Sequence, residues 1–205
     1  VEGLFVEWII KSIKPGGSAN IVLPDGIFTT IRNKNLKKYI KDTCYIEAII
    51  SLPINTFINT PKKTYILTLK KKRDISEIQN YSVFTYICKS IGETLDVRRF
   101  DTLEDNDFHD AVVKYNAYRK LVDKNNVEEP FKSWFYNDHQ LKFLAIDEFK
   151  PEIMWKIEDW WTEEEKISIG LKKENNMMSV AELQDFIGQI TEQMNEYKEI
   201  LECLK

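Results

Sequence analysis

The sequence is poor in the residues that build metal, disulfide and triad sites. Its 205 residues include three cysteines (Cys44, Cys88 and Cys203) and two histidines (His109 and His139). The cysteines lie far apart and form no C-x-x-C pair, so neither a disulfide framework nor a zinc site of recognised spacing is expected. A histidine-based catalytic triad and a Walker A loop are also missing. We therefore expect no metal and a reducing, cytoplasmic location.

Long hydrophobic runs are missing as well. No apolar run approaches the roughly 18 residues that a membrane span needs. The first ten residues contain Glu2 and Glu7 and lack the basic start of a signal peptide. The chain opens without methionine inside a helical pattern, which indicates a piece of something longer or an unobserved N-terminus. No membrane partner is expected.

The charge is small in total but unevenly distributed. The formal net charge is −4, yet residues 1–73 carry 13 basic and 5 acidic residues, and residues 74–205 carry 16 and 28. Hydrophobic residues make up 43% and charged residues 30%, which is typical of a globular chain. A basic stretch of net charge +8 hints at a nucleic-acid partner for the first part of the chain.

Apolar spacing predicts an α/β fold. A helix over 4–13 would have an apolar face made of Leu4, Phe5, Trp8, Ile9 and Ile13. The K-P-G-G sequence at 14–17 would end it in a type II turn. The predicted strands are 19–23, 46–52, 64–69 and, less regularly, 82–88. A helix capped by Asn33 separates the first two strands, which should therefore be parallel, whereas the third should return antiparallel.

The helix after Asn33 has one apolar face and one basic face. The residues expected to point inward are Leu36, Tyr39 and Ile40, and those expected to face solvent are Lys34, Lys37, Lys38 and Lys41.

The second half of the chain is less regular. A helix is predicted over 104–122, and an aromatic-rich, mostly irregular lobe over 128–170. A capping box at 179–182 opens a long amphipathic helix that reaches the end of the chain. We expect three parts: residues 1–90, a helical and irregular lobe at 91–175, and a C-terminal helix at 179–205.

Three segments carry a family resemblance. They are IKPGGSANIVLPDGIF at 13–28, IEAIISLP at 46–53, and F-x-x-T-x-K-K-T-x-I-L at 57–67. In order and spacing this series resembles the C-terminal part of N6-adenine DNA methylases, the methylase subunits of type I and related restriction-modification systems. IGETLDVRRFDTLEDNDFHDAV at 91–112 is also similar to the stretch that follows in that family.

The resemblance implies the C-terminal half of a Rossmann-like, S-adenosylmethionine-dependent methyltransferase sheet. The strand at 18–23 would be the fifth, the strand at 46–51 the sixth, and the antiparallel strand at 64–69 the seventh, lying between them. The family's F-x-G-x-G and N-P-P-F/Y motifs are missing, since the sequence has no Gly-x-Gly and no Asn-Pro. We therefore expect S-adenosylmethionine to serve the complete enzyme, no cofactor to bind this chain alone, and no catalytic residue within it.

The resemblance also implies site residues. Ligands of open α/β sheets bind beyond the carboxyl ends of parallel strands, so Pro24, Asp25 and Gly26 would form the active-site rim, although they also suit a plain turn. Phe57 would stack on the flipped-out adenine, or else fill the core. The residues expected to contact the DNA backbone are Arg32, Lys34, Lys37, Lys38, Lys62 and Lys63, against the alternative of a solvated helix face.

Partners and alternatives follow from the same reasoning. The expected partners are DNA, the upstream half of the methyltransferase domain and, through the C-terminal helix, a specificity subunit or domain. That helix could equally pack on this chain's own lobe. Two other functions stay open: a non-catalytic assembly module derived from a methylase, and half of a methyltransferase that acts on RNA or small molecules.

Overall fold

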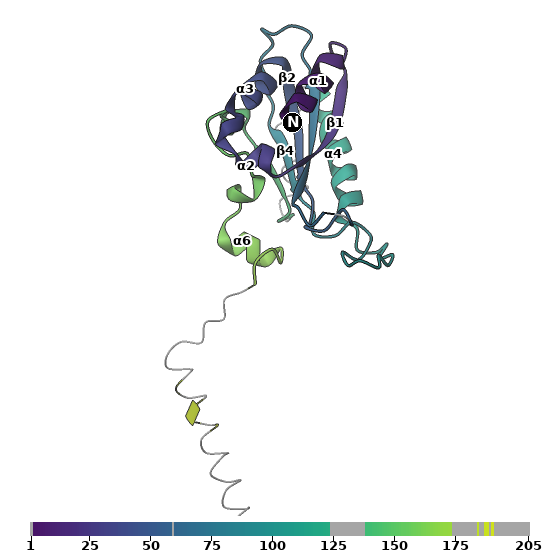
Figure 1. Ribbon diagram of the computed structural model, residues 1–205, viewed down its shortest axis with the longest axis vertical. Coiled ribbons are helices and arrows are strands. Elements are labelled where there is room, and N and C mark those ends of the chain that lie inside the picture. Colours follow the sequence, from purple (N-terminus) through teal and green to yellow (C-terminus); the bar gives the residue numbers. More distant parts are fainter. Residues whose placement is uncertain are drawn as a thin grey trace, which may run out of the picture. The chain divides into compact units, whose positions relative to one another are not determined.

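A five-stranded mixed sheet forms the centre of the computed structural model, which describes residues 2–58, 60–123 and 138–173, with Gln184, Ile187, Gly188 and Ile190. The strands lie in the order β1-β3-β2-β4-β5 (Figure 1). Their bounds are Ser18–Pro24 for β1, Cys44–Ser51 for β2, Thr64–Lys71 for β3, Val83–Ile87 for β4 and Leu141–Leu144 for β5.

The strand directions confirm the predicted topology. Strand β3 lies between β1 and β2 and is antiparallel to both, so β1 and β2 are parallel to each other. Strand β4 pairs parallel with β2, and β5 pairs antiparallel with β4. The predicted strand at 82–88 is thus confirmed, whereas β5 lies where the sequence predicts irregular structure. Its four residues are too short a signal to find by pattern.

Helices cover both faces of the sheet (Figure 1). Helices α1 (Glu2–Ser12), α2 (Gly26–Thr29) and α3 (Lys34–Thr43) cover one face, together with the segment that contains Phe149, Trp155 and Ile157. Helix α4 (Asp107–Asp123) covers part of the other face through Ala111, Tyr118 and Val122. A short 3-10 turn, η1 (Ile31–Asn33), precedes α3. Strand β2, which is buried on both faces, is the centre of the core.

The K-P-G-G turn is confirmed as a tight turn between α1 and β1. Gly17 N donates to Lys14 O at 2.8 Å, and Gly16 has a φ of +78°, the conformation that a type II turn requires at its third position. Lys71 at the end of β3 closes α1, because its Nζ donates to the carbonyls of Ile10 at 2.9 Å and Ile13 at 2.8 Å. Lys70 and Lys71 are therefore part of β3, and Lys72 and Arg73 follow its end.

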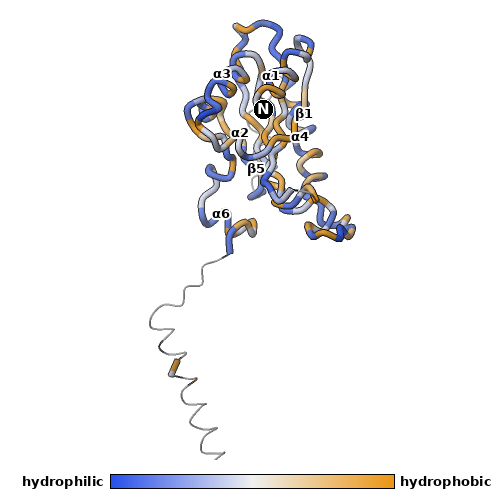
Figure 2. The backbone as a smooth tube through the Cα atoms, in the orientation of Figure 1, coloured by the Kyte–Doolittle hydropathy of each residue, from blue (hydrophilic) through white to orange (hydrophobic). Residues whose placement is uncertain are grey.

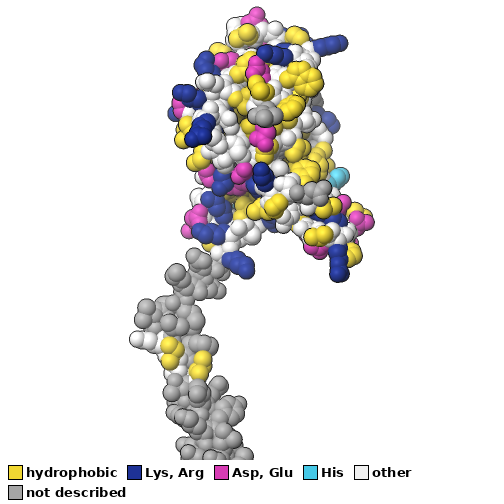
Figure 3. Space-filling model, in the orientation of Figure 1, with side chains coloured by type: hydrophobic (Ala, Val, Ile, Leu, Met, Phe, Trp, Pro, Cys, Tyr) yellow, Lys and Arg dark blue, Asp and Glu magenta, His cyan; other side chains and the backbone are white. Residues whose placement is uncertain are grey.

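The buried face of α1 differs from the predicted one. Val6 and Ile10 are fully buried, whereas Leu4, Phe5 and Trp8 are 71%, 58% and 66% exposed. Figure 2 shows hydrophobic residues along this helix, and Figure 3 shows hydrophobic side chains gathered on the face that α1 and β1 present. When a helix is apolar on more than one side, the spacing of its apolar residues does not predict which side is buried.

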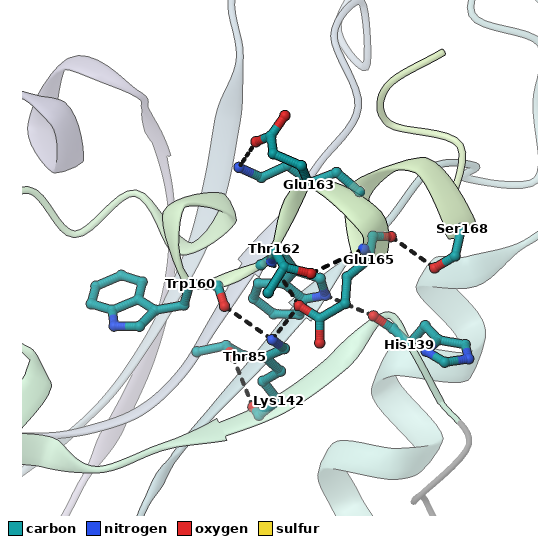
Figure 4. Close-up of polar contacts among 10 residues, drawn as sticks. Thr85, His139, Lys142, Trp160, Thr162, Glu163, Glu165 and Ser168 are labelled. Atoms are coloured by element: carbon teal, nitrogen blue, oxygen red, sulfur yellow. Dashed lines mark hydrogen bonds and ion pairs between the residues drawn. The ribbon is translucent and has the colours of Figure 1, made fainter. Parts of the chain in front are cut away.

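The segment after β5 packs against the sheet through 3-10 helices η2 (Ile146–Glu148) and η3 (Ile157–Trp160) and helix α6 (Glu163–Ser168). Figure 4 shows Lys142 of β5 pointing toward α6, where its Nζ meets Trp160 O at 2.9 Å and Glu165 Oε2 at 2.6 Å. Glu165 also completes a capping box with Thr162. These contacts fasten the segment predicted as a lobe to the edge of the sheet.

One compact unit spans Val1–Leu171, a range that includes the sheet and most of the stretch 91–175 predicted as a lobe. The second unit is Lys172–Lys205. Apart from four positions, the predicted helix at 179–205 lies outside the described residues. Within the described part, no helix is long and apolar enough to cross a membrane, and no group of three His, Cys, Asp or Glu could hold a metal ion.

Candidate functional site

The segments expected at the functional edge meet in the structure. Strands β1 and β2 end beside the start of β3, where Asp25 N donates to Lys63 O at 3.0 Å and Leu52 N donates to Thr64 O at 3.0 Å. Pro24, Asp25 and Gly26 are half-buried there, and Asp25 accepts backbone hydrogen bonds from the first turn of α2. The predicted rim and the loop 53–63 therefore form one continuous edge.

A buried carboxylate lies beneath this edge. Glu158, on η3, accepts from Ser51 Oγ at 2.6 Å and from Tyr65 OH at 2.7 Å, and it pairs with Lys63 Nζ at 3.1 Å. Burial alone would raise the pKa of Glu158, but the Lys63 charge and the two hydroxyl donors hold this pKa below its usual value. The network ties the ends of β2 and β3 to a segment far away in the sequence.

The same network accounts for the position of Lys63. The Lys63 side chain is 20% exposed and lies 5.7 Å from the centre of the Tyr65 ring. A DNA-backbone contact by Lys63 would compete with its ion pair to Glu158. In this structure Lys63 anchors one end of the loop 53–63.

Phe57 lies at the tip of this loop. Its side chain is 42% exposed, and the neighbouring Ile54 and Ile58 are 57% and 63% exposed. The loop folds back locally, because Thr60 N donates to Phe57 O at 3.1 Å and Thr56 Oγ1 donates to Pro53 O at 2.7 Å. Phe57 therefore does not fill the core, which leaves its ring accessible at the edge.

A second loop, within the family-like stretch 91–112 but with no site residue predicted in it, contacts the first. The guanidinium of Arg99 donates through Nη2 to the carbonyls of Asn55 and Thr56, the latter at 3.2 Å. Its Nη1 donates to Thr94 O at 3.2 Å. Sequence patterns do not show that the Arg99 side chain reaches a loop more than forty positions away.

Lys37 was expected at the surface, and the structure corrects this. Its side chain is fully buried, and its Nζ donates to Phe28 O at 3.1 Å and Ile153 O at 2.8 Å. Burial lowers the pKa of Lys37 to about 8. Lys37 therefore cannot contact DNA in this structure. Apart from Lys63, which pairs with Glu158, the remaining basic residues of the expected backbone set are all exposed: Arg32, Lys34, Lys38 and Lys62.

Glu47, the glutamate of the E-A-I-I-S-L-P segment, connects the sheet to helix α4. Glu47 lies at a bulge of β2, accepts from Tyr115 OH at 2.9 Å and pairs with Arg119 Nη1 at 3.0 Å. Burial raises the pKa of Glu47, and the charge of Arg119 opposes that rise. The glutamate fastens α4 to the sheet, away from the edge at Ser51.

Comparison with known proteins identifies the family. Residues 2–131 match the family model described as N-6 DNA Methylase. The chain belongs to this family. Over 68 residues it is 31% identical to the EcoKI methylase subunit of a type I restriction enzyme from Escherichia coli, a match that covers 33% of this chain and 13% of that protein. Over 59 residues it is 36% identical to the MpnII methylase subunit of Mycoplasma pneumoniae, which covers 29% and 11%.

Solved structures of related systems share the fold of this N-6 DNA methylase relative. A chain of a type I restriction-modification system superposes with a TM-score of 0.58 at 16% identity, over 100% of this chain and 40% of that one. The type IIG restriction endonuclease BpuSI gives 0.51 at 15% identity, over 83% and 18%. The chain thus spans a small part of its relatives, and its mixed sheet is part of a Rossmann-like methyltransferase fold.

Proposed function

We propose that this chain forms the C-terminal part of a restriction-modification methyltransferase that transfers a methyl group from S-adenosylmethionine to adenine N6 in DNA. The observation that carries the proposal is the arrangement at one edge: the β1 rim and the Phe57 loop meet around an antiparallel strand in a chain of the N-6 DNA methylase family. The donor site and the Asn-Pro-Pro-aromatic motif would come from the upstream half of the domain.

The surface around β1 suits such an upstream half. Within the described residues β1 pairs on one side only, and an unpaired strand edge favours the addition of a further strand. Beside this edge stand the exposed apolar residues of α1 and Val22, which is 49% exposed. A cavity of about 330 Å³ opens on the opposite face of the sheet, between Val22, Ile66 and Tyr115 among others. Together these features indicate a surface that another part of the enzyme covers.

The first prediction concerns the methyl donor. Titration calorimetry of this chain alone should detect no S-adenosylmethionine binding, because the Gly-x-Gly loop that holds the donor in the family is not in this sequence. Addition of the upstream half as a separate chain should restore binding. Micromolar binding by this chain alone would contradict the half-domain proposal.

The second prediction concerns Phe57, which we propose stacks on the flipped-out target base. In the complete methyltransferase, Phe57→Ala should lower methylation of paired adenine by about tenfold or more, since stacking on an aromatic ring is worth roughly 1–3 kcal/mol. Mismatched adenine, which flips at lower cost, should be affected less. Ile58→Ala, on the same loop and 63% exposed, is the matched control. Equal losses on both substrates would argue against stacking.

The third prediction concerns the DNA backbone, for which we propose the exposed Arg32, Lys34, Lys38 and Lys62. Lys62→Ala should weaken DNA binding equally for all sequences and reduce the slope of log K against log salt by about 1. Lys120→Ala, an exposed substitution near the end of α4, should leave that slope unchanged. A slope that stays the same in both variants would remove Lys62 from the interface.

The remaining proposals concern partners and the alternative function. We propose that the helix predicted over 179–205 binds a specificity subunit or domain, which would set the recognised sequence. A non-catalytic assembly module is the competing proposal. The coding sequence upstream of Val1 separates the two, because an in-frame Asn-Pro-Pro-Phe or Asn-Pro-Pro-Tyr favours the methyltransferase, and a start codon without that motif nearby favours the assembly module.

A further inference from the structure

We propose that Arg99 is a positioning residue that holds the Phe57 loop in the conformation required for base stacking. This inference rests on the proposed function of Phe57. It assigns a role in that site to the segment 91–106, which otherwise reads as a connection between β4 and α4.

The contacts of Arg99 fall on the residues directly before Phe57. The Arg99 guanidinium donates to the carbonyls of Asn55 and Thr56. Asn55 has a φ of +67°, the left-handed conformation that asparagine adopts readily in tight turns, so the two carbonyl contacts fall on a turn of the loop. The acceptors are backbone carbonyls, so the guanidinium fixes the path of the loop whatever its side chains are.

The turn that presents Arg99 is braced independently of the Phe57 loop. Asp96 Oδ1 accepts from the backbone N of Arg98 at 2.7 Å and of Arg99 at 3.1 Å. Thr94 N donates to Phe100 O at 2.8 Å, and Phe100 N donates to Thr94 Oγ1 at 2.9 Å. A turn closed by its own hydrogen bonds can act as a fixed support for a neighbouring loop.

The tip of the Phe57 loop needs a support of this kind. Its far end is anchored at Lys63 by Glu158, whereas its tip exposes Ile54, Phe57 and Ile58 and packs little of their surface. Stacking on an extruded base depends on a ring that is already in place, because ordering the loop during binding would cost free energy. Arg99 supplies the missing restraint between the tip and the body of the protein.

Hydrogen exchange of this chain tests the restraint directly. In Arg99→Gln, the backbone amides of residues 55–58 and of Thr60 should exchange roughly tenfold faster, because charge-assisted hydrogen bonds to the loop are lost. Arg99→Lys keeps the charge but not the forked geometry of the guanidinium. Its exchange rates should lie between those of the original protein and those of Arg99→Gln. Arg98→Gln changes an exposed neighbouring arginine and should leave these amides unchanged. Unchanged exchange in Arg99→Gln would overturn the inference, and unchanged exchange in α4 would show that the variant is folded.

A double-mutant cycle in the complete methyltransferase tests whether Arg99 acts through Phe57. Arg99→Gln should lower methylation of paired adenine more than of mismatched adenine, and should add little in the Phe57→Ala background. Independent, additive losses would contradict a positioning role. If Phe57→Ala shows no preference for paired adenine, the proposed stacking fails, while the exchange experiment still decides whether Arg99 holds the loop.

Discussion

Replacement of Glu158 by alanine is expected to lower the free energy of unfolding by about 3–5 kcal/mol, the usual cost of removing one partner from a buried ion pair. The Glu158 side chain is 10% exposed, and its loss would leave Lys63 without a counter-charge and the hydroxyls of Ser51 and Tyr65 without their acceptor. Urea unfolding followed by circular dichroism measures the change, provided that the slope with denaturant stays constant.

Asp159→Ala is the matched control, because Asp159 lies next in sequence, is 47% exposed and makes only a 3.8 Å pair with Lys156. It should cost at most about 1 kcal/mol. A loss of about 1 kcal/mol or less in Glu158→Ala as well would show that the buried network contributes little to stability.

The same network predicts a pH dependence with a defined sign. The pKa of Glu158 is lowered in the folded state, so the unfolded state binds its proton more readily. The stabilisation is therefore present above the usual glutamate value of 4.5 and is lost as the pH falls through the lower, folded pKa. Glu158→Gln should be less stable than the original protein at neutral pH, and this difference should shrink in acid.

The topology could be predicted from the sequence because it depends on local patterns. The two predicted parallel strands, the helix between them and the short loop before β3 leave few ways to arrange the sheet. The predicted position of the Phe57 loop at the carboxyl edge follows from the same order of elements. The exposure of Phe57, in contrast, was left open between core packing and the surface, since composition alone does not decide it.

The features that the sequence did not reveal depend on contacts between distant residues. Lys37 can be buried because the carbonyl of Ile153, 116 positions away, accepts a hydrogen bond from its Nζ. Glu158 can be buried because Ser51, 107 positions away, donates a hydrogen bond to its carboxylate and Lys63 supplies the opposite charge. An acid in a cluster of acids, or a lysine among lysines, is usually solvated, so neither residue stands out as buried until its partner is known.

Trp155→Ala is expected to lower the free energy of unfolding by about 3–5 kcal/mol, as for other large aromatic side chains removed from a core. Trp155 is 1% exposed, packs edge-on against Phe149 at 5.8 Å between ring centres, and donates from Nε1 to Lys150 O at 2.8 Å. Its backbone N also donates to Phe28 O, which joins the segment after β5 to the first turn beyond β1.

Thermal unfolding of Trp155→Ala shows whether the sheet and the segment after β5 unfold together. Because their buried side chains form one cluster, thermal unfolding followed by circular dichroism and by fluorescence should shift as a single transition in Trp155→Ala. Trp8→Ala, 66% exposed on α1, should change stability by about 0.5 kcal/mol or less. A separate, early transition of the C-terminal segment would instead support an independent lobe. Glu158 lies three residues after Trp155 and anchors the Phe57 loop through its ion pair with Lys63. A single transition would therefore mean that a change which destabilises this segment also breaks that ion pair.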